Sequence, residues 1–171
     1  MSEPGFLRLL ENKEDAILIT DKIKVSDFVL NVLLDNRSVC YVSDSFPLLS
    51  NLNVIENITL SNMFHENETL QQAAAKVTPF IENLGMQDAI LKRKESLSRE
   101  EIIRTCLLRA VSRGSDVIIT DFAKAGDLNI LKDSLVKINK RLFLWIMCLE
   151  EELGNYNDFA FKTVRLAGYK L

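Results

Sequence analysis

Histidine and cysteine are both scarce in this sequence. Its 171 residues include one histidine, His65, and three cysteines. The cysteines, Cys40, Cys106 and Cys148, are widely separated and each lies in an apolar run, which is typical of buried thiols in a reducing compartment. Because transition metals are usually held by several cysteine or histidine side chains, the sequence predicts no metal site.

Long apolar runs and an excess of basic charge are missing as well. The longest apolar run, residues 142–149, is far shorter than the roughly 20 residues that span a bilayer. The first residues, MSEPGF, contain no basic stretch ahead of an apolar segment, so no secretory signal is visible. With 21 basic and 24 acidic residues the formal charge is -3, which argues against a nucleic-acid-binding protein. We therefore expect a cytoplasmic protein that does not insert into the membrane.

The residues that are present suit a globular domain. Hydrophobic residues make up 47% of the chain, enough to bury one sizeable core, so we expect a single domain over residues 1–171. Strand-like and helix-like segments alternate along the chain. This order predicts an α/β fold with a mainly parallel sheet flanked by helices.

Residues 97–121, LSREEIIRTCLLRAVSRGSDVIITD, form the best-defined pattern. Ser98 and Glu101 have the spacing of a capping box, in which each side chain satisfies a backbone N–H of the first helical turn. An apolar helical face follows at three- and four-residue intervals. It comprises Ile102, Ile103, Cys106, Leu107, Ala110 and Val111. Residues 117–119 then predict a strand buried on both faces. Asp121 follows at the carboxyl end of this strand, where open α/β sheets bind ligands.

The remaining elements are predicted from shorter patterns. We expect strands at residues 16–20, 39–42 and 142–148, a turn at 21–26 leading into a helix over 28–33, a loop at 43–53, and helical segments at 54–94 and 128–140. Gly85 is expected to end a helix over residues 70–84. Pro79 is expected to mark a kink or a boundary within that helix.

The sequence resembles the ATP-binding-cassette (ABC) ATPases at two places. The first is residues 97–121, which resemble the family's signature helix (LSGGQ) and Walker B strand. The second is residues 54–57, which resemble the start of the family's helical subdomain. They lie, without a gap, at the family's distance from its glutamine, whose place is taken here by Asp44. The matching residues are Leu97, Ser98, Arg109, Ala110 and 116–121 in the first, and Val54, Glu56 and Asn57 in the second. The resemblance covers residues 16–171 and implies a P-loop NTPase fold with a helical subdomain at 54–96.

This sequence departs from the family where the family carries out its chemistry. Arg99 and Glu100 stand at the two glycines of the signature, and Glu101 stands at its glutamine. Phe122 takes the place of the glutamate that would activate water, and Leu149 that of the switch histidine. The resemblance therefore implies an ATPase-like domain that has lost its catalytic groups.

The turn that would hold nucleotide phosphates, residues 20–27, contains no glycine. A phosphate-binding loop needs glycines whose N–H groups face the phosphates, a lysine for the β and γ oxygens, and a hydroxyl for magnesium. Here Ser26 falls near the lysine position and Asp27 near the hydroxyl position, so a carboxylate would face the phosphates. Lys22 and Lys24 could reach an anion, although we favour a solvated turn. We therefore expect no cofactor, neither ATP nor magnesium.

Five residues occupy vestigial positions of the nucleotide site: Ser26, Asp27, Asp44, Ser98 and Asp121. Asp121 could hold magnesium through water, or it could cap the following turn. Ser98 could touch a partner's γ-phosphate, or it could serve only as a helix N-cap. We favour the structural role for both, and we expect no catalytic residue.

Four consecutive apolar residues, Phe46, Pro47, Leu48 and Leu49, are candidate partner contacts. An apolar cluster in a surface connection commonly marks an interaction site. The resemblance implies that residues 44–52 receive the coupling helix of a membrane permease. Alternatively, the four side chains pack inward and join the helical subdomain to the sheet. The sequence leaves both hypotheses open.

The favoured function is that of a pseudo-ATPase, a binding or regulatory subunit of an ABC transporter system. Its partner would be a competent ABC ATPase, a membrane permease or a second copy of the chain. One alternative is a weak or non-standard nucleotide-binding ATPase that uses Lys22 or Lys24 together with Asp121. Another is a small α/β interaction domain unrelated to transport, which shares only the fold.

Overall fold

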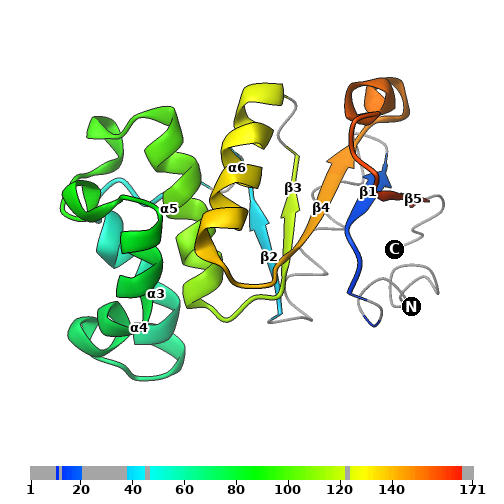
Figure 1. The fold of residues 1–171 in the computed structure, drawn as a ribbon. Coiled ribbons are helices and arrows are strands. Elements are labelled where there is room, and N and C mark those ends of the chain that lie inside the picture. The colour runs from blue at the N-terminus through cyan, green and yellow to red at the C-terminus, as the bar shows by residue number, and fades with distance from the viewer. Residues whose placement is uncertain (1–10, 12, 21–37, 45–46, 122–123, 167–171) are drawn as a thin grey trace.

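The computed structural model describes residues 11, 13–20, 38–44, 47–121 and 124–166. They contain one five-stranded sheet with strand order β2-β3-β4-β1-β5, in which every neighbouring pair is parallel. The strands are β1 (Ala16–Ile19), β2 (Val39–Val42), β3 (Val117–Thr120), β4 (Phe143–Cys148) and β5 (Lys162–Arg165). Helices pack against this sheet (Figure 1), so the predicted α/β fold is confirmed.

Four of the strands are buried along their whole length. Every residue of β1, β2, β3 and β4 is buried, as expected for apolar runs in a parallel sheet that is covered on both faces. These four confirm the strands predicted from the sequence. β5 is absent from the predicted elements, because its KTVR sequence is polar and largely exposed. Charged residues such as Lys162 and Arg165 are typical of an edge strand.

β1 lies inside the sheet although it comes first in the chain. It pairs with β4 on one side and β5 on the other, so that Ala16 stands opposite both Trp145 and Lys162. Polar contacts reinforce its junction with β4: the Leu144 N–H donates to Asp15 Oδ1 at 2.7 Å, and the Trp145 indole N–H donates to the Glu14 carbonyl at 2.8 Å. β1 therefore lies between two strands from the carboxyl-terminal part of the chain.

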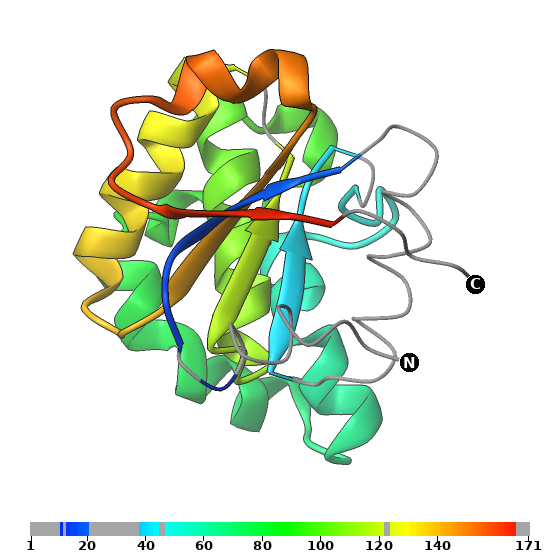
Figure 2. The same cartoon turned by 90° about the vertical axis from the view of Figure 1, so that its right-hand side faces the viewer.

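Two helices, α5 (Arg99–Ser112) and α6 (Ala125–Ile138), pack side by side behind the sheet (Figure 2). α3 (Val54–His65) and α4 (Leu70–Asn83) pack on α5 and form an outer layer. The main core lies between the sheet and these helices, and includes Ile118 of β3, Leu107 of α5 and Ile58 of α3. Of the apolar face predicted for α5, all members are buried except the half-buried Ile102.

The segment predicted as a helical subdomain is helical throughout most of its length. After α3 and α4 it contains two short 3-10 helices, Gln87–Ala89 and Lys94–Ser96. Its two ends are hydrogen-bonded together, because the N–H groups of Val54 and Ile55 donate to the carbonyls of Lys92 and Ile90 at 3.0 Å each. The segment thus leaves and rejoins the sheet layer at one place. Its independence as a subdomain stays a prediction.

Pro79 does not mark a helix boundary, because α4 runs through it from Leu70 to Asn83. A proline in a helix removes one N–H donor and frees the carbonyl four residues earlier, here that of Ala75. Both residues are exposed, so water can hydrate that carbonyl. Gly85 does follow the helix end as predicted, and its φ of 64° is a conformation that suits glycine.

None of the helices in the described parts of the chain is long and apolar enough to cross a membrane. The helix predicted over residues 28–33 lies outside the described residues.

Candidate functional site

The carboxyl ends of the parallel strands meet at one edge of the sheet. From β1 the chain crosses to β2 on one side, whereas from β4 it crosses to β5 on the other. Ligand sites of open α/β sheets lie where the connections diverge in this way. The described residues at this edge include Thr20 after β1, Ser43 and Asp44 after β2, and Asp121 after β3. Ser26, Asp27, Lys22, Lys24 and Phe46 lie outside the described residues.

Asp121 is engaged by a tyrosine of the neighbouring strand. The Tyr41 hydroxyl forms hydrogen bonds with Asp121 and Ser43, and burial together with the bond to Asp121 raises the pKa of Tyr41 above its usual value. The phenol therefore stays protonated and donates to the carboxylate. Lys124, not Asp121, is the N-cap residue of α6. Asp121 thus links β3 to β2. Residues 122 and 123 of the following turn lie outside the described residues, so the predicted capping of that turn by Asp121 stays a prediction.

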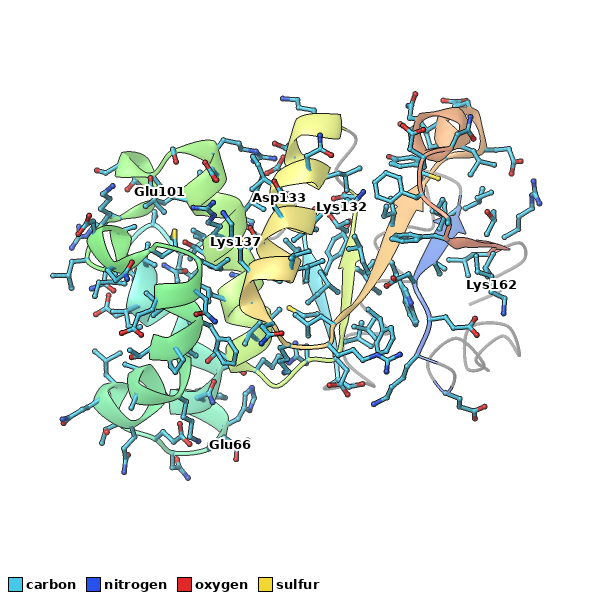
Figure 3. All side chains as sticks on the ribbon, in the orientation of Figure 1. Glu66, Glu101, Lys132, Asp133, Lys137 and Lys162 are labelled. Carbon is cyan, nitrogen blue, oxygen red and sulfur yellow. The ribbon has the colours of Figure 1, made fainter. Side chains whose placement is uncertain are left out.

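Ser98 and Glu101, the second of which is labelled in Figure 3, form the predicted capping box at the start of α5. The Glu101 N–H donates to Ser98 Oγ at 3.2 Å, and the Ser98 N–H donates to Glu101 Oε2 at 2.7 Å. Glu101 also accepts a hydrogen bond from Lys92 Nζ at 2.8 Å. This contact with Lys92 is the largest of the interactions that lower the pKa of Glu101 to about 2. Both residues of the box are therefore occupied by structural bonds.

Arg99, the first residue of α5, holds two carboxylates at once. Its Nη1 and Nη2 donate to the two oxygens of Asp44 at 2.5 and 2.9 Å. Its Nε and Nη2 donate to the two oxygens of Asp127, in the first turn of α6, at 3.1 and 2.6 Å. The Arg99 guanidinium lowers the pKa of Asp44. One side chain thus connects the end of β2 with the starts of two helices.

A cavity of 280 Å³ lies beside this arginine. Charged groups of Asp44, Lys94 and Arg99 and apolar groups of Leu48, Ile102 and Cys106 are among its lining residues. Pro47 also lines it and is exposed, whereas Leu48 is only 4% exposed. Leu49 is 46% exposed. The described part of the apolar loop is therefore divided, because Leu48 belongs to the core and Pro47 and Leu49 face solvent.

Asn57 of α3 fixes the backbone of this loop. Its Oδ1 accepts from the Leu49 N–H at 2.8 Å, and its Nδ2 lies 3.1 Å from the Leu49 carbonyl, 3.2 Å from that of Leu52 and 3.0 Å from that of Asn53. The Asn57 side chain is buried with the residue, which is 2% exposed. A buried amide with several partners is costly to displace. The exposed side chain of Leu49 is thus presented from a fixed backbone.

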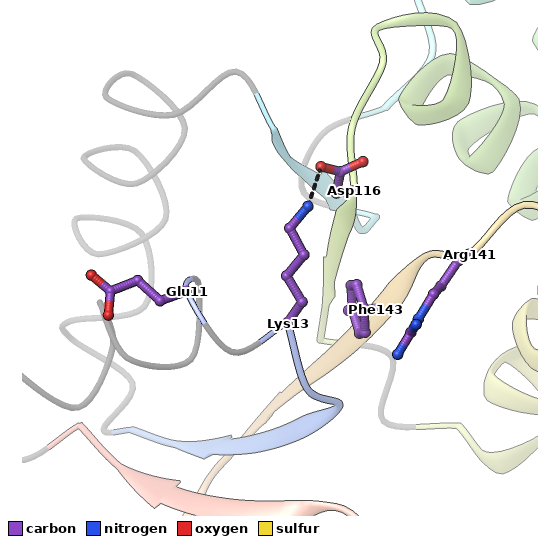
Figure 4. Close-up of a pocket in the computed structure, with 5 residues that line it drawn as sticks. All are labelled: Glu11, Lys13, Asp116, Arg141 and Phe143. Atoms are coloured by element: carbon purple, nitrogen blue, oxygen red, sulfur yellow. Dashed lines mark hydrogen bonds and ion pairs between the residues drawn. The ribbon is translucent and has the colours of Figure 1, made fainter.

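A second cavity, of 400 Å³, lies at the opposite end of the strands (Figure 4). It is lined by Glu11, Lys13, Asp116, Arg141 and Phe143. Lys13 pairs with Asp116 at 3.2 Å, and the Arg141 guanidinium lies 5.2 Å from the centre of the Phe143 ring. Two cations and two carboxylates balance one another here. The cavity therefore offers no net charge for a phosphate or a metal ion.

Among the described residues at the carboxyl edge, Asp44 and Asp121 are acidic, and the guanidinium of Arg99 is paired with two carboxylates. No group of three or more His, Cys, Asp or Glu side chains in the described parts of the chain could hold a metal ion. Residues 21–27 of the turn that would hold phosphates lie outside the described residues. The expectation of no ATP and no magnesium therefore stays a prediction.

The sequence predicts that Asp44 and Ser98 lie at this site, but it does not predict the contacts of Asp127 and Tyr41. Arg99 is visible in the sequence only as a substitution at a glycine position. A signal exists in retrospect, since Arg99 and Asp44 both replace uncharged residues of the family pattern with opposite charges. Asp127 carries no such signal, because an acidic residue in the first turn of a helix is common.

No protein-family model matches the chain. The methionine import ATP-binding protein MetN of Streptococcus agalactiae is 23% identical over 162 residues, which are 92% of this chain and 45% of that protein. MetN of Lactobacillus johnsonii is 26% identical over 132 residues, 75% of this chain and 38% of that protein. The chain spans less than half the length of these relatives.

Solved structures of ABC transporter ATP-binding subunits share the fold of this chain. cbiO1 from Clostridium perfringens, part of the ABC transporter complex cbiONQ, superposes with a TM-score of 0.61 at 12% identity, covering 80% of this chain and 67% of that chain. The ATP binding subunit of another ABC transporter superposes with a TM-score of 0.62 at 14% identity, covering 90% and 74%. The predicted P-loop NTPase fold is thereby confirmed.

Proposed function

Because the homologues of this chain are the ATP-binding proteins of ABC transporters, we propose that it is a pseudo-ATPase that serves such a transporter as a binding or regulatory subunit. The observation that carries this proposal is the arrangement around Arg99. At positions that the family uses for nucleotide, this chain has Arg99 bound to Asp44 and Asp127. The charge of Arg99 is thereby balanced by carboxylates of its own chain, which supports the loss of a phosphate-binding role for this residue.

Three further features support the loss of nucleotide chemistry. The turn at residues 20–27 contains no glycine, Phe122 stands at the place of the catalytic glutamate, and Leu149 stands at that of the switch histidine. Asp121, which would reach magnesium, is bonded to Tyr41 instead. These changes affect separate steps, namely phosphate binding, water activation and magnesium binding, and together they favour a protein without ATPase activity.

The partner surface that we propose is the loop around Leu49 with the adjacent cavity of 280 Å³. Leu49 is exposed on a backbone held by Asn57, and the cavity is lined by both apolar and charged residues. Such a surface suits an apolar side chain of a protein partner. We propose a permease as the first candidate, with a competent ABC ATPase or a second copy of this chain as others, and a place in the cytoplasm at the membrane surface.

Titration with magnesium-ATP tests the proposal directly. A ligand that binds only the folded protein raises its melting temperature, so the pseudo-ATPase should show no saturable shift up to millimolar nucleotide and no phosphate release. The same titration of a competent ABC ATPase is the control. A saturable shift would favour the alternative of weak nucleotide binding through Lys22 or Lys24 and Asp121.

A further inference from the structure

The Arg99 side chain joins three elements that are distant in sequence. Asp44 follows β2, Arg99 begins α5 and Asp127 lies in the first turn of α6. We propose that Asp44, Arg99 and Asp127 form a latch, which holds the loop at residues 47–53 in a fixed position beside the sheet. The latch is a conformational device of the free protein and does not depend on the proposed function.

The geometry requires an arginine. Three guanidinium nitrogens make four contacts with two carboxylates, at 2.5 to 3.1 Å. The planar fork of arginine matches such an arrangement, whereas a lysine ammonium is a single point charge. The Asp127 side chain is only 9% exposed, against 69% for Asp44. Loss of the guanidinium would leave the carboxylate of Asp127 nearly buried without a counter-charge, which is unfavourable.

The loop is fixed on its two sides by different contacts. On the α3 side, Asn57 bonds to the backbone of Leu49 and Leu52. On the β2 side, the charged contact of Asp44 is with Arg99. The cavity of 280 Å³ is lined by both Arg99 and Leu48. Without Arg99, the β2 side is released while the Asn57 side remains, so the loop and the cavity should open together.

Hydrogen exchange at the loop tests the latch. In Arg99→Met, the amides of residues 48–53 should exchange at least about tenfold faster, because bonds between charged groups are lost next to the loop. Arg165→Met is the matched control, since Arg165 also binds a carboxylate with two nitrogens, that of Glu150, at 3.1 and 2.7 Å. The control should leave the loop unchanged. Equal exchange in the two variants would overturn the proposal.

Two further variants separate a latch from simple charge neutralisation. Arg99→Lys keeps the charge but not the fork, so it should retain most of the acceleration seen in Arg99→Met. Full restoration by lysine would contradict the latch. If Arg99 connects the carboxylates, Asp127→Asn should not raise the exchange rate further in the Arg99→Met background, because the carboxylate that it removes is already unpaired there. Rates that multiply in the double variant would show that Asp127 acts independently, and would also overturn the proposal.

Discussion

The Tyr41 hydroxyl on β2 donates a hydrogen bond to Asp121, the residue after the neighbouring strand β3. Asp121 is the residue that the family resemblance assigns to magnesium, yet the structure gives it a bond within the sheet. The carboxylate thereby helps to hold the carboxyl ends of two strands together. A position that resembles a catalytic one in the sequence has a measurable structural role.

Tyr41→Phe should therefore destabilise the protein. It removes a hydrogen bond to a charged group, and we expect a loss of about 1.5 to 3 kcal/mol in the free energy of unfolding. Tyr156→Phe is the control, because Tyr156 is also buried but its hydroxyl has no hydrogen bond among the interactions found in the described residues. Urea denaturation measures both. A Tyr41→Phe protein as stable as the control would show that the bond contributes nothing.

Ile119→Asp should prevent folding. Ile119 is 0% exposed and lies between β2 and β4, opposite Tyr41 and Trp145. An unpaired carboxylate there has an unfavourable free energy of several kcal/mol, comparable with the roughly 5 to 15 kcal/mol that stabilises a whole domain. Thr163→Asp, at an exposed position of the edge strand β5, should be tolerated. Circular dichroism and solubility distinguish the two variants, and a folded Ile119→Asp protein would contradict the strand assignment.

Leu49→Ser should abolish binding of the partner without affecting stability. Leu49 is 46% exposed, so the melting temperature of the Leu49→Ser protein should hardly differ from that of the wild type. Val136→Ser removes another exposed apolar side chain, 80% exposed on α6, and is the control for binding. Co-purification with a co-expressed permease or ABC ATPase is the measurement. Unchanged co-purification of Leu49→Ser would remove this loop from the interface.

Leu48→Ser should have the opposite effect. Leu48 is 4% exposed and belongs to the main core. Truncation of a buried aliphatic side chain typically costs about 2 to 5 kcal/mol, so this variant should melt at a clearly lower temperature. Thermal unfolding of Leu48→Ser and Leu49→Ser side by side tests the division of the loop. Equal melting temperatures would show that the two residues do not differ in burial.

Glu101 should contribute to stability only above acidic pH. The contact with Lys92 lowers the pKa of Glu101 in the folded state from 4.5 to about 2. The contribution is therefore fully present above about pH 4.5 and is lost as the pH falls towards 2. Glu101→Gln should lose less stability than the wild type between pH 5 and pH 2, as measured by denaturant unfolding. Glu95→Gln, at an exposed residue for which no ion pair is found in the described parts of the chain, is the control.

The sequence predicts the sheet well because four of its strands are continuous apolar runs, which only a two-sided core can bury. The capping box of Ser98 and Glu101 is also predictable, since both partners lie within one helical turn. The latch of Asp44, Arg99 and Asp127 is not predictable, because the two carboxylates lie 55 and 28 residues away from Arg99 in the chain. Residue spacing in the sequence predicts contacts between neighbours on one helix or strand, and it does not predict contacts between such distant residues.

The loop shows a different limit. Phe46 to Leu49 are all apolar, so composition cannot tell which side chains point inward. The buried amide of Asn57 decides this for Leu48 and Leu49 by fixing the backbone between them and α3. Asn57 belongs to the match with the ABC family, yet nothing in its spacing indicates that it binds the loop. The predicted loop is present, and only the structure assigns its two faces.

The position of β1 inside the sheet has a consequence for synthesis on the ribosome. Ala16 pairs with Trp145, which is 129 residues later in the chain. At about 5 to 20 residues per second, β1 waits on the order of 6 to 26 seconds for this partner. Until then its apolar side chains and strand edges lack the neighbours that cover them in the folded protein. The nascent chain is therefore a natural client for a chaperone, and premature release should favour aggregation over folding.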